Sequence, residues 1–138
     1  MDEKTLILAS ASQHCENLLI EWLASLRTLG NYHGKVMVLD YGIGNRVKMP
    51  VTKLSAQLYP CKKPNPEKII VNYRFVDMLP IIEQYRQHKI VTFDADIGFT
   101  SDIGELFNEI DEVPGCLYSV ECRSKLFNEG RGPRGSKL

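Results

Sequence analysis

The sequence predicts an α/β fold, in which an open, mainly parallel sheet carries helices on both faces. Three observations predict it: short apolar segments of strand length recur along the chain, segments with helical periodicity stand between them, and turn residues separate the two kinds. Strands that alternate with helices form βαβ units, whose parallel strands are joined by helical crossovers. Right-handed crossovers then build a sheet with a layer of helices on each side.

The first two elements lie between residues 4 and 30. Residues 4–9 are a short apolar run bounded by polar residues, which is typical of a buried strand. Ser12 then stands where a helix N-cap is expected. Apolar side chains follow at helical spacing, namely Cys15, Leu18, Leu19, Trp22, Leu23, Leu26 and Leu29. This stripe predicts an amphipathic helix that ends at Gly30.

The next part of the chain predicts two strands. Residues 35–40 form a second buried strand, and the turn residues 41–45 end it. Residues 46–63 fit a short helix followed by a third strand around residues 55–61.

A second long helix is expected after this strand. The segment Pro64-Asn65-Pro66-Glu67 is typical of a helix start. We expect the helix to break or kink at Pro80, which lacks a backbone N–H, and a second short helical piece to reach about Gln87. Residues 88–94 then form the fourth strand.

One more helix and one more strand complete the prediction. Asp102 with Glu105 three residues later is typical of a capping box, which predicts a helix over residues 103–110. Residues 115–122 are the last predicted strand.

Length and charge narrow the function classes. The chain has 138 residues, the size of about one domain. Seventeen basic and seventeen acidic residues give a net charge of zero, which argues against a general nucleic-acid binder. No apolar run is long enough to span a bilayer, and the acidic start is unlike a secretory signal. We expect one domain over residues 1–122 and a basic, glycine-rich, disordered tail over residues 123–138.

The cysteines favour a reducing compartment. The four of them, Cys15, Cys61, Cys116 and Cys122, lack the close pairing of a zinc site. We therefore expect free thiols and a cytoplasmic protein.

Two acids follow the fourth predicted strand. Asp94 and Asp96 come after an apolar segment, and in a continuing strand residues two apart point to the same face. Carboxylates that close repel each other unless a cation sits between them or one takes up a proton. A hard divalent ion such as Mg²⁺ or Mn²⁺ accepts these oxygen ligands and leaves positions open for phosphate oxygens. The alternative is that one acid caps the following turn while the other is solvated.

Two more residues are candidates for a ligand site. Asp40, at the end of the second predicted strand, either accepts hydrogen bonds from a ribose or nucleobase or caps a turn. Arg74 lies on the helix that leads back to the fourth strand, and its guanidinium either neutralises a phosphate or is solvated. Gly42-Ile43-Gly44 lacks the third glycine of a dinucleotide fingerprint, and it follows the second predicted strand instead of the first. We therefore interpret it as a turn and expect neither NAD nor FAD.

A tyrosine–arginine helix, a Leu-Pro pair, a strand that ends in D-A-D and a further helix occur in this order. The residues are Val71-Asn72-Tyr73-Arg74-Phe75, Met78-Leu79-Pro80, His88 to Phe99, and Asp102 to Phe107. This combination resembles the core of GT-A-fold glycosyltransferases. It is most similar to the branch that contains bacterial lipopolysaccharide galactosyl- and glucosyltransferases and glycogenin.

The resemblance implies transfer of a hexose from a nucleoside-diphosphate sugar, most often a UDP-hexose, to a glycan or other acceptor. In such enzymes the acids that match Asp94 and Asp96 hold Mn²⁺ or Mg²⁺, which bridges the donor diphosphate and neutralises the leaving group. The arginine that matches Arg74 lies near the donor sugar or phosphate. The same resemblance assigns the nucleotide site to Ala9, Ser10, Ala11, Ser12, Asp40 and Ala95.

The chain departs from this family in its second half. Family members are usually much longer, and their second half supplies the acceptor site and a later metal-binding histidine. This chain has no histidine after His88. One alternative is therefore a truncated or degenerate domain that binds a nucleotide or a partner protein without catalysis. Peripheral contact with a membrane-borne acceptor and self-association also stay open.

A haloacid-dehalogenase-like phosphatase is a further alternative. Such an enzyme also uses a D-x-D motif at the end of a strand, where one aspartate is the nucleophile. Its motif normally follows the first strand, whereas here Asp94 comes late in the chain. The order of the later acidic and basic residues also fits this class poorly.

Overall fold

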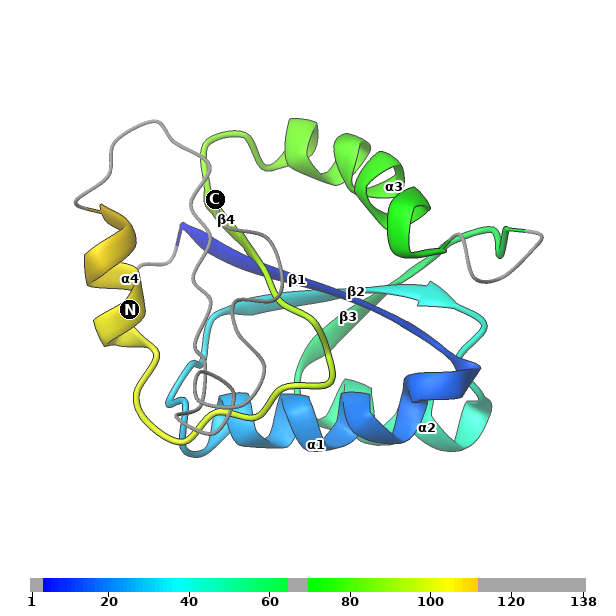
Figure 1. The fold of residues 1–138 in the computed structure, drawn as a ribbon, viewed down its shortest axis with the longest axis horizontal. Helices are drawn as coiled ribbons and strands as arrows, with labels where there is room; N and C mark the ends of the chain where they lie inside the picture. The colour runs from blue at the N-terminus through cyan, green and yellow to red at the C-terminus, as the bar shows by residue number, and fades with distance from the viewer. Residues whose placement is uncertain (1–3, 65–69, 112–138) are drawn as a thin grey trace, which may run out of the picture. The chain divides into compact units, whose positions relative to one another are not determined.

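The computed structural model of the protein describes residues 4–64 and 70–111. Within these ranges the fold is α/β, as the sequence predicts (Figure 1). The strands are β1 (Thr5–Ser12), β2 (Lys35–Tyr41), β3 (Ala56–Pro60) and β4 (Lys89–Thr92). The helical elements are the 3₁₀ turn η1 (Gln13–Cys15), α1 (Glu16–Arg27), α2 (Asn45–Lys53), α3 (Ile70–Gln84) and α4 (Gly104–Asp111).

The described strands form one parallel sheet in the order β3-β2-β1-β4. β1 pairs with β2 as far as Ser12, which lies opposite Tyr41. On its other side β1 pairs with β4 only as far as Leu8, which lies opposite Thr92. The chain moves outward from β1 to β3 and then returns to the far side of β1 for β4. The strand order therefore reverses between β1 and β4.

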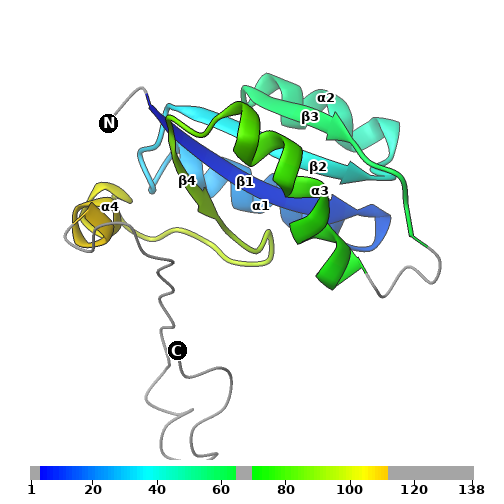
Figure 2. The same ribbon diagram turned by 90° about the horizontal axis from the view of Figure 1, so that it is seen from above.

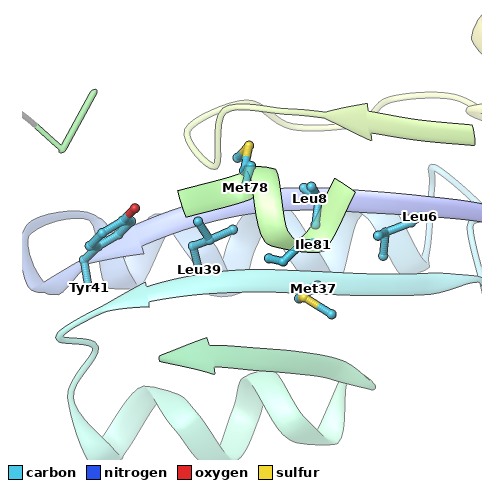
Figure 3. Close-up of a cluster of buried hydrophobic side chains, with 7 residues drawn as sticks. All are labelled: Leu6, Leu8, Met37, Leu39, Tyr41, Met78 and Ile81. Atoms are coloured by element: carbon cyan, nitrogen blue, oxygen red, sulfur yellow. The ribbon is translucent and has the colours of Figure 1, made fainter. Parts of the chain in front are cut away.

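Helices cover both faces of this sheet. α3 lies across one face, whereas α1 and α2 lie against the other (Figures 1 and 2). Parallel sheets are buried on both sides because βαβ crossovers place helices there. A core cluster fills the space between the sheet and α3 (Figure 3), and it consists of Leu6, Leu8, Met37, Leu39, Tyr41, Met78 and Ile81.

β1 is longer than the sequence predicts. It continues through Ser12 instead of ending at Ala9, so Ser10, Ala11 and Ser12 are strand residues and not a loop. Side chains alternate between the two faces of a strand, and the leucines of β1 in the core cluster face α3. Ser10 and Ser12 therefore face α3, whereas the buried Ala9 and Ala11 face the α1 side.

α1 confirms the centre of the apolar stripe read from the sequence, because Leu19, Trp22, Leu23 and Leu26 are buried. The predicted ends of the stripe are wrong: Leu18 and Leu29 are exposed, and the helix ends before Leu29. Arg27 at the end of α1 fastens the helix to two loops. Its guanidinium donates hydrogen bonds to four backbone carbonyls, those of Tyr32, Gly34, Leu54 and Ser55. The loops at the amino ends of β2 and β3 are thereby held to one side chain.

α3 is one continuous helix, and Pro80 lies inside it. The expected break at Pro80, with a separate helical piece up to Gln87, is therefore wrong. Met78 and Ile81, on either side of Pro80, are buried against the sheet. Their packing outweighs the loss of one backbone hydrogen bond, because tertiary burial supplies most of the stability of a helix in a protein. The expected helix start at 64–67 falls largely on residues 65–69, outside the described ranges.

The chain divides into two compact units, Met1–Gly104 and Glu105–Leu138. The sheet and α1 to α3 belong to the first unit. The last predicted strand, over residues 115–122, and the tail over residues 123–138 lie outside the described residues. Among the helices that are described, none has the length and apolar character needed to cross a bilayer.

Candidate functional site

The reversal of strand order between β1 and β4 locates the candidate site. In open α/β sheets, ligands bind outside the carboxyl ends of the strands at such a switch point. The two flanking strands carry the polar residues that the sequence singles out. Ser10 and Ser12 lie in the last part of β1, and β4 leads into Asp94 and Asp96.

The two acids are not part of a continuing strand. β4 ends at Thr92, although the N–H of Phe93 still donates to the carbonyl of Leu8. Residues 95 and 96 then form a turn. The extended geometry that would point both carboxylates to one face is therefore absent, because the backbone turns between them. Asp94 and Asp96 are nonetheless both exposed, and the buried Ala95 stands between them.

Arg74 lies against the first of these acids. Its Nη1 donates to Oδ1 of Asp94 at 2.8 Å, and the Asp94 side chain is 60% exposed. The guanidinium carbon also lies 4.9 Å from the centre of the Phe75 ring. The Arg74 side chain is only 23% exposed, so it is not the solvated helix residue of the alternative interpretation. Its Nε is buried without a hydrogen-bond partner among the described residues.

Asp40 caps a turn. Its Oδ1 accepts hydrogen bonds from the backbone N–H groups of Gly42 (2.9 Å) and Ile43 (2.7 Å). Its Oδ2 lies 3.8 Å from Nζ of Lys48 on α2. Of the two interpretations of Asp40, the structure therefore favours the turn cap, because one carboxylate oxygen is already shared by two donors. The side chain is buried, which leaves little of it exposed to a ligand.

The four predicted residues at the end of β1 do not share one surface. Ser10 and Ser12 face α3, the side from which Arg74 approaches Asp94. Ala9 and Ala11 are buried on the opposite face. Of these four residues only Ser10 lies on the α3 side and is partly exposed, so it alone among them can offer its side chain to a ligand there.

A polar group that the sequence analysis missed lies beside this site. The hydroxyl of the fully buried Tyr41, at the end of β2, donates a hydrogen bond to Oδ2 of Asp77 on α3. Burial, reinforced by the hydrogen bond to Asp77, raises the pKa of Tyr41 far above its usual range. Cys61 lies beside the pair, and burial together with the Asp77 charge raises the pKa of its thiol to about 11.

A signal for this group exists in the sequence. Asp77 follows Arg74 by three residues, which places both on one face of a helix. The strand alternation that buries Leu39 also points Tyr41 to the same side. The sequence does not show, however, that the face of β2 with Tyr41 packs against the face of α3 with Asp77.

Asp94 and Asp96 are the candidate ligands for a divalent metal ion. Within residues 4–64 and 70–111, no group of three or more His, Cys, Asp or Glu side chains gathers into a cage. Mg²⁺, however, is usually held by one or two carboxylates together with substrate phosphates, not by an all-protein cage. Asp94 and Asp96 are exposed hard oxygen donors of that kind.

The chain matches no protein-family model. No curated protein sequence matches it either.

Proposed function

We propose that this protein binds a nucleoside-diphosphate sugar together with Mn²⁺ or Mg²⁺ at the switch point between β1 and β4, and transfers the hexose to a glycan or other acceptor. The observation that carries the proposal is the contact between Arg74 and Asp94. It joins a cation and a carboxylate at the sheet edge where open α/β sheets bind ligands. The resemblance of residues 71–107 to GT-A-fold glycosyltransferases supplies the substrate class.

The charges at this edge suit a diphosphate. Asp94 and Asp96 contribute two negative charges and Arg74 one positive charge, so a divalent cation brings the sum to plus one, which attracts a negatively charged diphosphate. The planar guanidinium of Arg74 offers further N–H donors besides the one that Asp94 uses, and two of them can bind phosphate oxygens side by side.

The chain's own residues bind and orient the donor in this proposal. Asp94 and Asp96 hold the metal ion, which neutralises the charge that develops on the departing nucleoside diphosphate. Arg74 binds the phosphates or the donor sugar from the α3 side. The hydroxyl of Ser10, which is only partly buried, is available to the nucleotide from the last part of β1, whereas Ser12 is buried. Asp40 shapes the neighbouring turn instead of touching the ligand.

We place this activity in the cytoplasm. Cys15 and Cys61 are free thiols in the described part of the chain. Free thiols are typical of proteins in a reducing compartment.

Calorimetric titration with UDP tests the proposal. We expect wild-type protein to bind UDP when Mn²⁺ is present and to bind it much more weakly when Mn²⁺ is absent. The variant Asp94→Ala/Asp96→Ala should lose at least about tenfold in affinity, the smallest loss common for disturbed metal sites. Glu83→Ala is the matched control, because Glu83 is an exposed acid on α3 whose ion pair in the described part of the chain is with the exposed Arg86.

A second measurement separates transfer from binding. Release of UDP from UDP-glucose or UDP-galactose, in the presence of candidate glycan acceptors, reports catalysis. Metal-dependent binding without UDP release would favour the alternative of a non-catalytic nucleotide-binding domain. If wild-type protein does not bind UDP either with or without Mn²⁺, the proposed function is overturned. If the double variant and wild type bind UDP with equal affinity, Asp94 and Asp96 are not metal ligands of the UDP site.

A further inference from the structure

The face of α3 that meets the sheet changes character along the helix. Its residues follow helical spacing, and they are Arg74, Asp77, Met78 and Ile81, with Tyr85 directly after the helix. Met78 and Ile81 belong to the core cluster, and Tyr85 packs against it. The later part of α3 is therefore held by apolar burial, whereas the earlier part presents Arg74 and Asp77.

Between Tyr73 and Asp77, α3 has little apolar anchorage. From Tyr73 onward, the first residue of α3 to be buried is Met78. Within residues 73–77 the large apolar side chains are exposed, and they are Tyr73, Phe75 and Val76. In the described part of this turn, polar contacts must therefore fix where the helix lies on the sheet.

The described residues show two such contacts, and they differ in how deeply the partner is buried. Arg74 reaches Asp94, but Asp94 is largely exposed and follows the end of β4. Asp77 instead accepts a hydrogen bond from the hydroxyl of Tyr41, a fully buried residue of β2 whose backbone lies opposite Ser12 in the sheet. The Tyr41 contact therefore fastens α3 to the most rigid part of the fold, because it is anchored in both the sheet ladder and the core cluster.

We propose that Asp77, held by Tyr41, is a positioning residue that fixes the turn of α3 carrying Arg74 against Asp94. Residues three apart on a helix are neighbours on the same rigid turn. When the hydrogen bond to Tyr41 fixes Asp77, it therefore also fixes the backbone position of Arg74. Asp77 touches neither metal nor nucleotide in this proposal. The part that concerns nucleotide affinity rests on the proposed function, and the part that concerns Arg74 does not.

The test compares two fully buried tyrosines, Tyr41 at the end of β2 and Tyr32 in the loop before β2. Tyr41→Phe removes only the hydroxyl that binds Asp77. Tyr32→Phe is the matched control, since Tyr32 is also fully buried and its hydroxyl also donates hydrogen bonds, to the carbonyls of Thr5 and Lys35. Those residues lie at the amino ends of β1 and β2, away from the candidate site.

The first readout needs no ligand. The Nε–H of Arg74 is buried, so its exchange with water, followed by NMR, reports how firmly the side chain is held. We expect Tyr41→Phe to raise the exchange rate by about tenfold, as expected when a local contact opens more often. Tyr32→Phe should leave the rate at the wild-type value. Equal rates in wild type and Tyr41→Phe overturn the proposal.

The second readout is UDP affinity with Mn²⁺. Tyr41→Phe should weaken binding by about fivefold, a part of what a hydrogen bond to a charged group contributes. In an Arg74→Ala background the same substitution should change the affinity by less than about twofold, because the two changes then act through one missing side chain. If Tyr41→Phe still weakens UDP binding about fivefold in the Arg74→Ala background, Asp77 does not act through Arg74.

A second pair of variants serves if Tyr41→Phe fails to fold. Asp77→Asn keeps a side-chain oxygen that can accept the Tyr41 hydroxyl, so it should keep the wild-type exchange rate at Arg74. Asp77→Ala removes the acceptor and should behave like Tyr41→Phe. If Asp77→Asn and Asp77→Ala give the same exchange rate for the Nε–H of Arg74, the proposal is wrong. If wild-type protein binds no UDP, the proposed function fails, and the exchange rates alone decide the positioning role.

Discussion

Arg74 and Asp94 are 20 residues apart in the sequence, yet a distance of 2.8 Å separates Nη1 of the one from Oδ1 of the other. The contact joins α3 to the segment after β4, beside the place where the strand order reverses. The sequence singles out both residues as candidates for the same site. Their contact is a result of the crossover that brings α3 back over the sheet (Figure 2).

This ion pair should matter little for stability. Because Asp94 is 60% exposed, solvent screens its attraction to Arg74. We expect Asp94→Asn to lower the free energy of unfolding by less than about 1 kcal/mol, as for other surface pairs. Urea unfolding measures it, with Glu83→Gln as the control for an exposed pair on α3. A loss of several kcal/mol would mean that the pair is structural and would weaken its assignment to a ligand site.

Asp40 should behave in the opposite way. Asp40→Ala leaves the N–H groups of Gly42 and Ile43 without their acceptor, so we expect a loss of about 1–3 kcal/mol in the free energy of unfolding. Asp40→Asn keeps an oxygen for both donors and should lose less than half as much. Chemical denaturation of both variants decides the point. If Asp40→Asn and Asp40→Ala destabilise the protein equally, the charge of Asp40 and its contact with Lys48 contribute more to stability than its hydrogen bonds to the turn.

Gly42 and Gly98 form a matched pair for backbone strain. Gly42 has φ of 100°, which side chains rarely adopt, whereas Gly98 does not lie in that region. A Cβ added at either position meets no atom within 4 Å, so packing contributes to neither substitution. We expect Gly42→Ala to cost about 1–2 kcal/mol and Gly98→Ala to be neutral or slightly stabilising. Equal thermal unfolding midpoints for the two variants would contradict this account of the turn.

Cys61 should react only at strongly alkaline pH. Burial, and then the Asp77 charge, raise its pKa from 9.0 to about 11. The thiolate is the form that reacts with iodoacetamide, so the alkylation rate of native protein should reach half its maximum near pH 11. A variant that keeps Cys61 and carries serine at the other three cysteine positions makes the rate specific.

The same pKa shift predicts how stability depends on pH. A folded-state pKa above the unfolded value means that the stabilising contribution is complete below pH 9 and is lost as the pH rises through about 11. Asp77→Asn should move the alkylation midpoint down toward 9, because it removes one of the two main causes. A native midpoint near 9 in the chain with Asp77 intact would show that Cys61 is not held beside that carboxylate.

The local elements were largely predictable. The apolar stripe of α1 and the apolar runs of β1 and β2 depend on side-chain spacing, which the sequence contains in full. The continuity of α3 through Pro80 was not, because it depends on how firmly Met78 and Ile81 pack on the sheet. The extension of β1 to Ser12 was missed for a related reason: pairing with β2 continues to Tyr41, and partners in a ladder are invisible in one strand's sequence.

By itself, the sequence determined the α/β class and the polar residues that follow the strands, since both depend on residue type and spacing along the chain. Only the tertiary structure decided what each of those residues contacts. It assigned Asp40 to a turn, brought Arg74 to Asp94 and paired Tyr41 with Asp77. These contacts depend on the strand order and on which helix covers which face. They are set by burial of the whole apolar surface at once, and not by any local pattern.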